Sequence, residues 1–222
     1  MMAAPSLSFP FLESFSCAIF DCDGVLLDSN AVKVEAFERT LVDEDPDLVA
    51  AFIDEHRRTG GVSRYAKLRR FYTELATVAE PELAIESALR RFSAACREGL
   101  RACQPVAGAR ELIAALVARR VPLHVVSGGD QDEVREALEH HGLAERFAGI
   151  HGSPTPKREH LERLRADGDL LPGGVYLGDA RLDMELAEAF GLSFIFVAGV
   201  SDWPEGREVA RARGHRVVED LR

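Results

Sequence analysis

Apolar and polar residues follow two alternating patterns along the C-terminal half of the chain. Short apolar runs rich in β-branched residues alternate with segments whose apolar residues recur every three or four positions. Strands that alternate with helices predict a parallel sheet covered by helices on both faces. The predicted strands are 16–21, 121–127, 147–150, 174–179, 193–199 and, at a sheet edge, 215–221; the predicted helices are 107–117, 130–140, 157–165 and 182–190.

Residues 31–102 interrupt this alternation, because no convincing strand pattern occurs there. Pro46 and Pro81 suit helix starts, and Gly60-Gly61 suits a turn. The expected fold class is therefore α/β, a Rossmann-like parallel-sheet core with an inserted all-α helical domain. The expected domains are 1–29 with 103–222 for the core and 30–102 for the insertion. The predicted helices of the insertion are roughly 30–42, 47–59, 63–79 and 81–101.

Composition changes this picture only by excluding partners. The 222 residues are 46% hydrophobic and 29% charged, as in ordinary globular proteins, and the net charge is −10. Such a charge repels nucleic acids and anionic membranes. No stretch approaches the roughly 20 apolar residues that span a bilayer. We therefore expect neither a nucleic-acid partner nor a membrane, and a monomer or small homo-oligomer.

The N-terminus and the cysteines indicate a cytoplasmic protein. The first 15 residues lack a basic region and are interrupted by Pro5, Pro10 and Glu13, so we expect no signal peptide. The four cysteines have no CxxC spacing, which favours reduced, packed thiols.

Two carboxylates directly follow the first predicted strand, in Asp21-Cys22-Asp23-Gly24. Ligands bind at the strand ends of open α/β sheets. One carboxylate can attack phosphorus while the other passes a proton to the leaving oxygen. Gly24 permits a turn with positive φ. The alternative is a surface turn rich in Asp and Gly.

Two further groups that can bind phosphate follow later strands. Ser127, with Gly128 and Gly129 after it, offers a hydroxyl and free backbone N–H groups. Lys157 offers an ammonium that can neutralise both phosphate and nucleophile. The alternatives are a turn that begins a helix and a solvated lysine.

A pair of carboxylates after the strand 174–179 suits a metal. Asp179 lies at the strand end and Asp183 four residues later. Mg²⁺ prefers hard carboxylate oxygens and few protein ligands. The alternative is that Asp179 caps a helix and Asp183 is exposed to solvent.

Together, the order DxDG, Ser, Lys, GDxxxD resembles the haloacid dehalogenase superfamily, whose members are mostly phosphatases. The resemblance covers nearly the whole chain. The segments that carry it are FDCDGVLLDS (20–29), VVSGG (125–129), Lys157 and LGDARLD (177–183).

The resemblance implies a role for each motif residue. Asp21 is expected to be the nucleophile that forms an aspartyl-phosphate, and Asp23 the general acid and base. Ser127, Gly128 and Lys157 are expected to hold the phosphoryl group. The expected Mg²⁺ ligands are Asp21, Asp23 through its backbone carbonyl, Asp179 and Asp183, the last of which would place a metal-bound water or Lys157.

The inserted helices resemble the helical cap of this superfamily, which closes over the substrate. TGGVSRYAKL (59–68) is similar to the substrate loop of β-phosphoglucomutase, which implies that Arg64 contacts the substrate. Lys33 stands where that mutase has a histidine; it can contact the substrate, and it disfavours mutase action. The alternatives are a simple turn at Gly60-Gly61 and a solvated Lys33.

The expected function is Mg²⁺-dependent hydrolysis of a small phosphate ester, either a sugar phosphate or a phosphorylated acid. A sugar phosphomutase of the β-phosphoglucomutase type is the first alternative. A phosphoryl-accepting signalling or binding module is the second, and the helical insertion after the first strand disfavours it.

Overall fold

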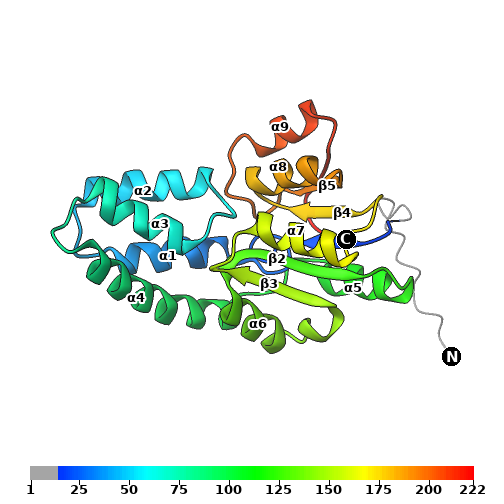
Figure 1. Cartoon of the computed structure of the whole chain (residues 1–222), viewed down its shortest axis with the longest axis horizontal. Helices are drawn as coiled ribbons and strands as arrows, with labels where there is room; N and C mark the ends of the chain where they lie inside the picture. Colours follow the sequence, from blue (N-terminus) through cyan, green and yellow to red (C-terminus); the bar gives the residue numbers. More distant parts are fainter. Residues whose placement is uncertain (1–14) are drawn as a thin grey trace.

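A computed structural model describes residues 15–222 (Figure 1). The N-terminal segment for which no signal peptide is expected lies almost wholly outside the described residues. Among the described helices, none combines the length and the apolar character needed to cross a bilayer. All four cysteines are free thiols.

The core is a six-stranded sheet in the order β3-β2-β1-β4-β5-β6. All neighbouring strands are parallel. This confirms the α/β class and the Rossmann-like core. The segment 215–221, predicted to lie at a sheet edge, contains the edge strand β6. The strands are β1 (Ala18–Phe20), β2 (Leu123–Asp130), β3 (Gly149–Ser153), β4 (Val175–Gly178), β5 (Ser193–Val197) and β6 (Arg216–Val218).

Helices cover both faces of the sheet because side chains of a strand alternate between its faces. In β1, Ala18 and Phe20 pack in one hydrophobic cluster and Ile19 in another. The first cluster includes residues of α5 (Ala109–Ala118) and α6 (Gln131–His140). The second includes residues of the remaining core helices, α7 (Lys157–Asp167), α8 (Arg181–Phe190) and α9 (Gly206–Ala212).

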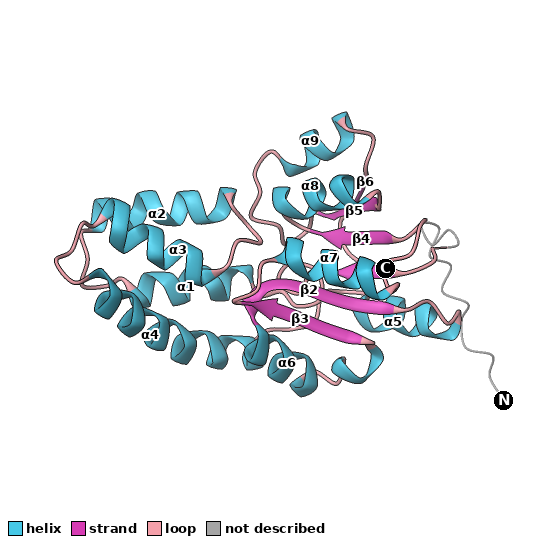
Figure 2. Cartoon of the chain, viewed as in Figure 1, coloured by secondary structure: helices cyan, strands magenta, loops and turns pink. Residues whose placement is uncertain are grey.

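Residues 30–102, which lie between β1 and α5 in the chain, contain helices and no strand, and these helices lie beyond the carboxyl ends of the strands (Figure 2). They bury a shared apolar interior that includes Phe37, Phe52 and Phe92. The rings of Phe37 and Phe92 are 4.4 Å apart. The helices are α1 (Asn30–Thr40), α2 (Pro46–Arg58), α3 (Arg64–Arg70), the π-helical turn η1 (Phe71–Leu75) and α4 (Pro81–Ala102).

The two chain connections between the helical segment and the sheet lie side by side. The backbone N–H of Asp28 donates to the carbonyl of Gln104 at 2.9 Å, and that of Val106 donates to the carbonyl of Leu26 at 3.0 Å. The two connections between the helical segment and the core are therefore hydrogen-bonded to each other.

Several elements differ from the sequence prediction. The helix predicted over 63–79 is wrong in its extent: α3 passes into the π-helical turn, and the helical path ends before Thr77, whose φ of 48° is left-handed. The third strand lies about two residues later than predicted, and the helix α9 and the short 3-10 turn η2 (Ala144–Arg146) were not predicted. The α9 segment is rich in Arg, Gly and Glu, so its apolar periodicity is weak.

Candidate active site

The predicted site residues converge where the strand order changes direction. From the central strands β1 and β4, the chain continues to β2 and to β5, which lie toward opposite edges of the sheet. Ligands bind in the crevice that opens at such a point. Asp21 follows β1 directly and Asp179 follows β4 directly.

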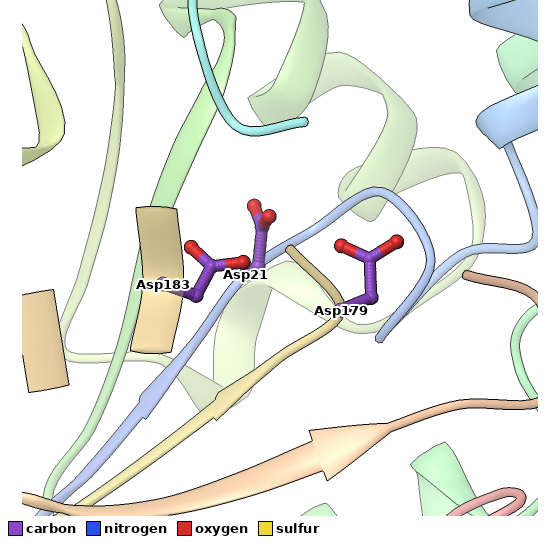
Figure 3. A group of neighbouring side chains, drawn as sticks. All are labelled: Asp21, Asp179 and Asp183. Atoms are coloured by element: carbon purple, nitrogen blue, oxygen red, sulfur yellow. The ribbon is translucent and has the colours of Figure 1, made fainter. Parts of the chain in front are cut away.

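Three carboxylates form a compact group there. Ligand oxygens of Asp21, Asp179 and Asp183 all lie within 4.8 Å of one another, and the three residues are 3%, 6% and 0% exposed. Figure 3 shows Asp21 between the other two, with Asp183 projecting from α8. Like charges this close and this deeply buried need a cation near them.

Lys157 supplies one such cation. It is the first residue of α7, and its Nζ lies 2.7 Å from Oδ2 of Asp21 and 2.7 Å from Oδ1 of Asp183. The other oxygen of Asp21 accepts the backbone N–H of Cys22 at 2.7 Å. The carboxylate of Asp21 is therefore fixed at both oxygens.

The carboxylate of Asp183 is fixed by hydrogen bonds from Ala180 and Tyr176. This residue occupies the third position of α8, where it accepts the backbone N–H of Ala180 at 3.2 Å, a favourable place for a carboxylate at a helix N-terminus. The hydroxyl of Tyr176 donates to it at 3.0 Å. The alternative of a cap at Asp179 with an exposed Asp183 is wrong, since Ala180 is the capping residue and Asp183 is buried.

Burial dominates the electrostatics of this group. It raises the pKa of Asp21 to about 7, against the opposing effect of Lys157, and Asp183 and Asp23 raise it further. Burial and the charges of Asp21 and Asp183 likewise hold the pKa of Asp179 well above its usual range. The pKa of Lys157 is raised well above its usual range, because Asp183 and Asp21 outweigh the effect of its burial.

The donor set fits a hard divalent cation. Three carboxylates face one ammonium, so the group carries negative charge that an additional cation would offset. Asp179 is oriented by Asn30, whose Nδ2 donates to its Oδ2 at 2.6 Å and to the carbonyl of Val200 at 2.9 Å. Gly24 is needed beside it, since a Cβ there would lie 2.1 Å from Oδ2 of Asp179 and φ is +72°.

The side chain of Asp23 contacts residues at the start of α1. Its Oδ1 accepts the hydroxyl of Ser29 at 2.5 Å and lies 3.4 Å from Nζ of Lys33. Its side chain is not one of the three clustered carboxylates, which agrees with a metal ligand role only through its backbone carbonyl. The structure thus brings Lys33 to the candidate acid and base.

Ser127 and Gly128 form the neighbouring wall at β2. The Oγ of Ser127 accepts the backbone N–H of Gly129 at 3.0 Å, and Ser127 is fully buried. A Cβ at Gly128 would lie 2.2 Å from the carbonyl oxygen of Gly61. The loop between α2 and α3 therefore packs directly against the end of β2.

Arg64 is engaged by the core. Its guanidinium donates two hydrogen bonds to Glu133 of α6, at 2.6 and 3.1 Å, and lies over the ring of Phe92. Its neighbour Tyr65 donates to Asp130 at 2.6 Å. These contacts join the helical segment to the core, and the role of Arg64 toward a substrate stays a prediction.

A cleft lies between the helical segment and the sheet. Asp21, Asp23 and Asp179 line its core side, and Lys33 and Arg64 line its helical side. Its empty volume is about 670 Å³, part of it open to solvent, which suits a small molecule. Other lining residues are Asn30, His56, Arg57, Gly60, Gly61, Lys67, Gly128, Gly129, Asp202 and Trp203.

Four residues that support the site were not predicted from the sequence. Ser29 ends the segment 20–29 that carries the first motif and Asn30 follows it, so both were recognisable as polar residues beside that motif. Tyr176 lies within an apolar strand, where an aromatic residue reads as core. Glu133 reads as an exposed first-turn acid, and only the packing of α6 against α4 and the pairing with Arg64 of α3 reveal its burial.

Comparison with known proteins places this geometry in a family. A family model described as haloacid dehalogenase-like hydrolase matches residues 18–197. The chain is 27% identical over 217 residues to the phosphoglycolate phosphatase of Rhodospirillum rubrum, which covers 91% of this chain and 86% of that protein.

Solved structures show the same fold. A hydrolase from Pseudomonas syringae superposes with a TM-score of 0.75 at 23% identity, over 93% of this chain and 94% of that one. The β-phosphoglucomutase of Clostridium difficile superposes with a TM-score of 0.71 at 16% identity, over 93% of this chain and 92% of the mutase. At these identities the likeness establishes the fold alone.

Proposed function

Because the chain belongs to the haloacid dehalogenase-like hydrolase family, we propose that it hydrolyses a small phosphate ester through an aspartyl-phosphate on Asp21. One observation carries this proposal. Asp21 is a buried carboxylate at a strand end, held by Lys157 at 2.7 Å and facing a cleft. A nucleophile fixed at one position removes the entropic cost of orienting it.

Mg²⁺ is the proposed cofactor. Asp21 and Asp179 would hold it with the backbone carbonyl of Asp23, while Asp183 orients Lys157 and completes the acidic group. When bound, the cation would neutralise charge on the carboxylates and on the phosphate. The negative charge left after pairing with Lys157 supports this assignment.

In the first proposed step, an oxygen of Asp21 forms a bond to phosphorus as the bond from phosphorus to the leaving oxygen breaks. Asp23 donates its proton to that leaving oxygen, which departs as an alcohol. Lys157, the hydroxyl of Ser127 and the backbone N–H of Gly128 offset the charge on the transferring group.

In the second step, water attacks the phosphorus of the aspartyl-phosphate. Asp23, now a carboxylate, takes a proton from this water, and the bond from phosphorus to Asp21 breaks. Inorganic phosphate is released and both carboxyl groups return to their starting states. Ser29 and Lys33 fix the Asp23 carboxylate in the orientation that both transfers need.

Residues 30–102 are proposed to act as a cap that closes over the substrate, with the core formed by 1–29 and 103–222. The paired connections at Asp28 and Gln104 give one narrow junction about which the segments could move. Contact between Gly61 and Gly128 supports a closed form, in which water is excluded from the cleft.

A phosphorylated acid is the favoured substrate class over a sugar phosphate, because the Rhodospirillum rubrum relative is named a phosphoglycolate phosphatase. A sugar phosphomutase stays the alternative, supported by Arg64 in the cleft wall. A signalling module is disfavoured by membership of a hydrolase family. Cytoplasmic location, absence of a nucleic-acid partner and oligomeric state stay predictions.

The test is phosphate release from a panel of phosphate esters, with and without Mg²⁺, by the wild type and Asp21→Asn. We expect metal-dependent release that the variant lacks. Undiminished release by Asp21→Asn would exclude Asp21 as the nucleophile. Absence of release from every ester, together with interconversion of sugar phosphates, would establish the mutase instead.

A further inference from the structure

The cleft contains one buried cation that has no carboxylate partner among the described residues. Lys67 of α3 is 7% exposed and lines the cleft, yet it forms no ion pair within residues 15–222. The other cationic residues of the cleft wall are paired: Lys33 with Asp23, Arg64 with Glu133 and Arg57 with Asp54. Lys67 is thus the cleft cation that is still available to an anion.

Within residues 15–222, the Lys67 ammonium has one polar partner, which is His56 of α2. Nζ lies 2.7 Å from Nδ1 and 3.2 Å from the carbonyl oxygen of that residue. An ammonium has three N–H donors, so one is left over. Because Nδ1 accepts from Lys67, the neutral ring of His56 carries its proton on Nε2, which has no hydrogen-bond partner in the described part of the chain.

This arrangement is costly for the unliganded protein. Burying an ammonium without a counterion is unfavourable. Burial lowers the pKa of Lys67 to about 7. Burial and the charge of Lys67 lower the pKa of His56 to about 2, so the ring is neutral. A bound anion would remove the cost, and such stored instability is typical of binding sites.

We propose that Lys67 and the Nε2–H of His56 bind a second anionic group, a carboxylate or a phosphate, on the leaving group of the substrate. This proposal rests on the phosphatase function proposed above and narrows its substrate to esters with two negative groups. One of these groups lies at Asp21 in the core and the other at Lys67 in the helical segment. Such a substrate binds both segments, so it favours their closed arrangement.

The test compares three two-carbon esters that differ only at the distal end. These are 2-phosphoglycolate with a carboxylate, ethylene glycol bisphosphate with a second phosphate, and ethylene glycol monophosphate with a hydroxyl. We expect the wild type to prefer at least one of the two esters whose distal group is anionic. Its kcat/KM for that ester should be on the order of tenfold to hundredfold above that for the hydroxyl ester. The preferred ester tells which anionic group the site takes.

Lys67→Met keeps the length and apolar character of the side chain and removes the charge. We expect it to abolish the preference by lowering kcat/KM for the preferred ester far more than for the hydroxyl ester. Lys67→Arg should keep part of the preference. Arg70→Met removes an exposed charge from the same helix and should leave the preference intact, which separates direct contact from long-range steering.

An equal loss for all three esters in Lys67→Met, or no preference in the wild type, would overturn the proposal. Calorimetric binding to Asp21→Asn separates this outcome from failure of the phosphatase function. If no ester is hydrolysed, tighter binding of 2-phosphoglycolate than of ethylene glycol monophosphate, lost on adding Lys67→Met, still supports the anion site. Equal binding of the two excludes it.

Discussion

The Nζ of Lys157 lies 2.7 Å from Oδ2 of Asp21, in a position where both side chains are almost completely buried. Because the same ammonium also lies 2.7 Å from Oδ1 of Asp183, one cation links the candidate nucleophile to a second buried carboxylate. Its removal would leave two carboxylates without their shared partner.

The first prediction concerns Lys157→Met. We expect kcat to fall by roughly 10²- to 10³-fold, because charge on the transferring phosphoryl group loses its preorganised cation. Lys157→Arg should not restore it, since a planar guanidinium does not fit the space of the Lys157 side chain, which is only 1% exposed. Phosphate release on the best ester measures both. Activity within about threefold of wild type in either variant would contradict the role.

The second prediction concerns the metal. Mg²⁺ should raise the melting temperature, because it binds the folded acidic group and not the unfolded chain. Asp179→Asn should weaken this effect. The Mg²⁺ concentration that gives half of the rise in melting temperature should increase by about 10- to 100-fold. Thermal unfolding across a Mg²⁺ titration measures the shift. Glu159→Gln, which changes an exposed carboxylate, is the control, and an equal shift in both variants would argue against the site.

The third prediction concerns the buried pair Arg64–Glu133. Arg64→Met and Glu133→Gln should each destabilise the protein by about 2–5 kcal/mol, because each leaves a buried charge or polar group unpaired. The double variant should lose less than the sum. Urea unfolding gives the coupling energy. Arg69→Met breaks an exposed pair with Glu82 and should cost less than about 1 kcal/mol; additive effects at Arg64 and Glu133 would refute the coupling.

The fourth prediction concerns the stability of Lys67→Met without ligand. Burial lowers the pKa of Lys67 from 10.5 to about 7, so the unfolded chain binds more protons between these values. Wild-type stability should therefore rise as pH increases from 7 to 10.5, and the variant should lack this rise. Near pH 7 the variant should be more stable, by up to about 4 kcal/mol.

Urea unfolding between pH 7 and pH 10 measures this difference. The neutral His56 ring contacts Lys67 directly, and the charged Lys33, Arg57, Arg64 and Asp202 line the same cleft. Arg70→Met is the control, since its charge is exposed in the folded protein. A Lys67→Met protein with the wild-type pH profile would show that the ammonium is not buried in solution.

The fifth prediction concerns two stacked histidines, one in β2 and one in the edge strand β3. The rings of His124 and His151 lie 5.9 Å apart, and neither ring nitrogen of His124 has a partner within the described residues. Burial lowers the pKa of both rings, and nearby His160 and His124 contribute to a value of about 4 for His151. Both are therefore neutral in the folded protein near pH 7.

Because the unfolded histidines bind protons near pH 6.5, stability should fall as pH drops from 6.5 toward 4. The loss attributable to His151 is at most about 3 kcal/mol. His151→Gln should flatten this part of the pH profile in urea unfolding, and exposed His140→Gln should leave it unchanged. An unaltered slope in His151→Gln would contradict the buried neutral state.

The core of the fold was predictable because its signals are local. Apolar runs of β-branched residues, such as that before Ser127, are buried strands, and Gly191 ends its helix in a left-handed conformation. The acidic motif residues follow strand ends, and parallel strands bring their carboxyl ends to one edge. Their convergence was therefore predictable from chain order.

Element boundaries were less predictable where local signals compete with packing. The helical pattern through Phe71 and Tyr72 continues in sequence, but both rings are buried and the backbone widens into a π-helical turn. Local periodicity does not report how neighbouring helices share the interior of the helical segment.

The sequence by itself determined the alternation of strands and helices, apart from the short elements η2 and α9, and the position of each motif at a strand end, because both depend on residues close together in the chain. Only the tertiary structure decided which charges are paired. Arg64 meets Glu133 across 69 positions, whereas Lys67, three residues further on, meets no carboxylate within the described chain. The reason is that an ion pair depends on how one segment packs on another, and a basic run has the same sequence whether its members are solvated, neutralised or left for a ligand.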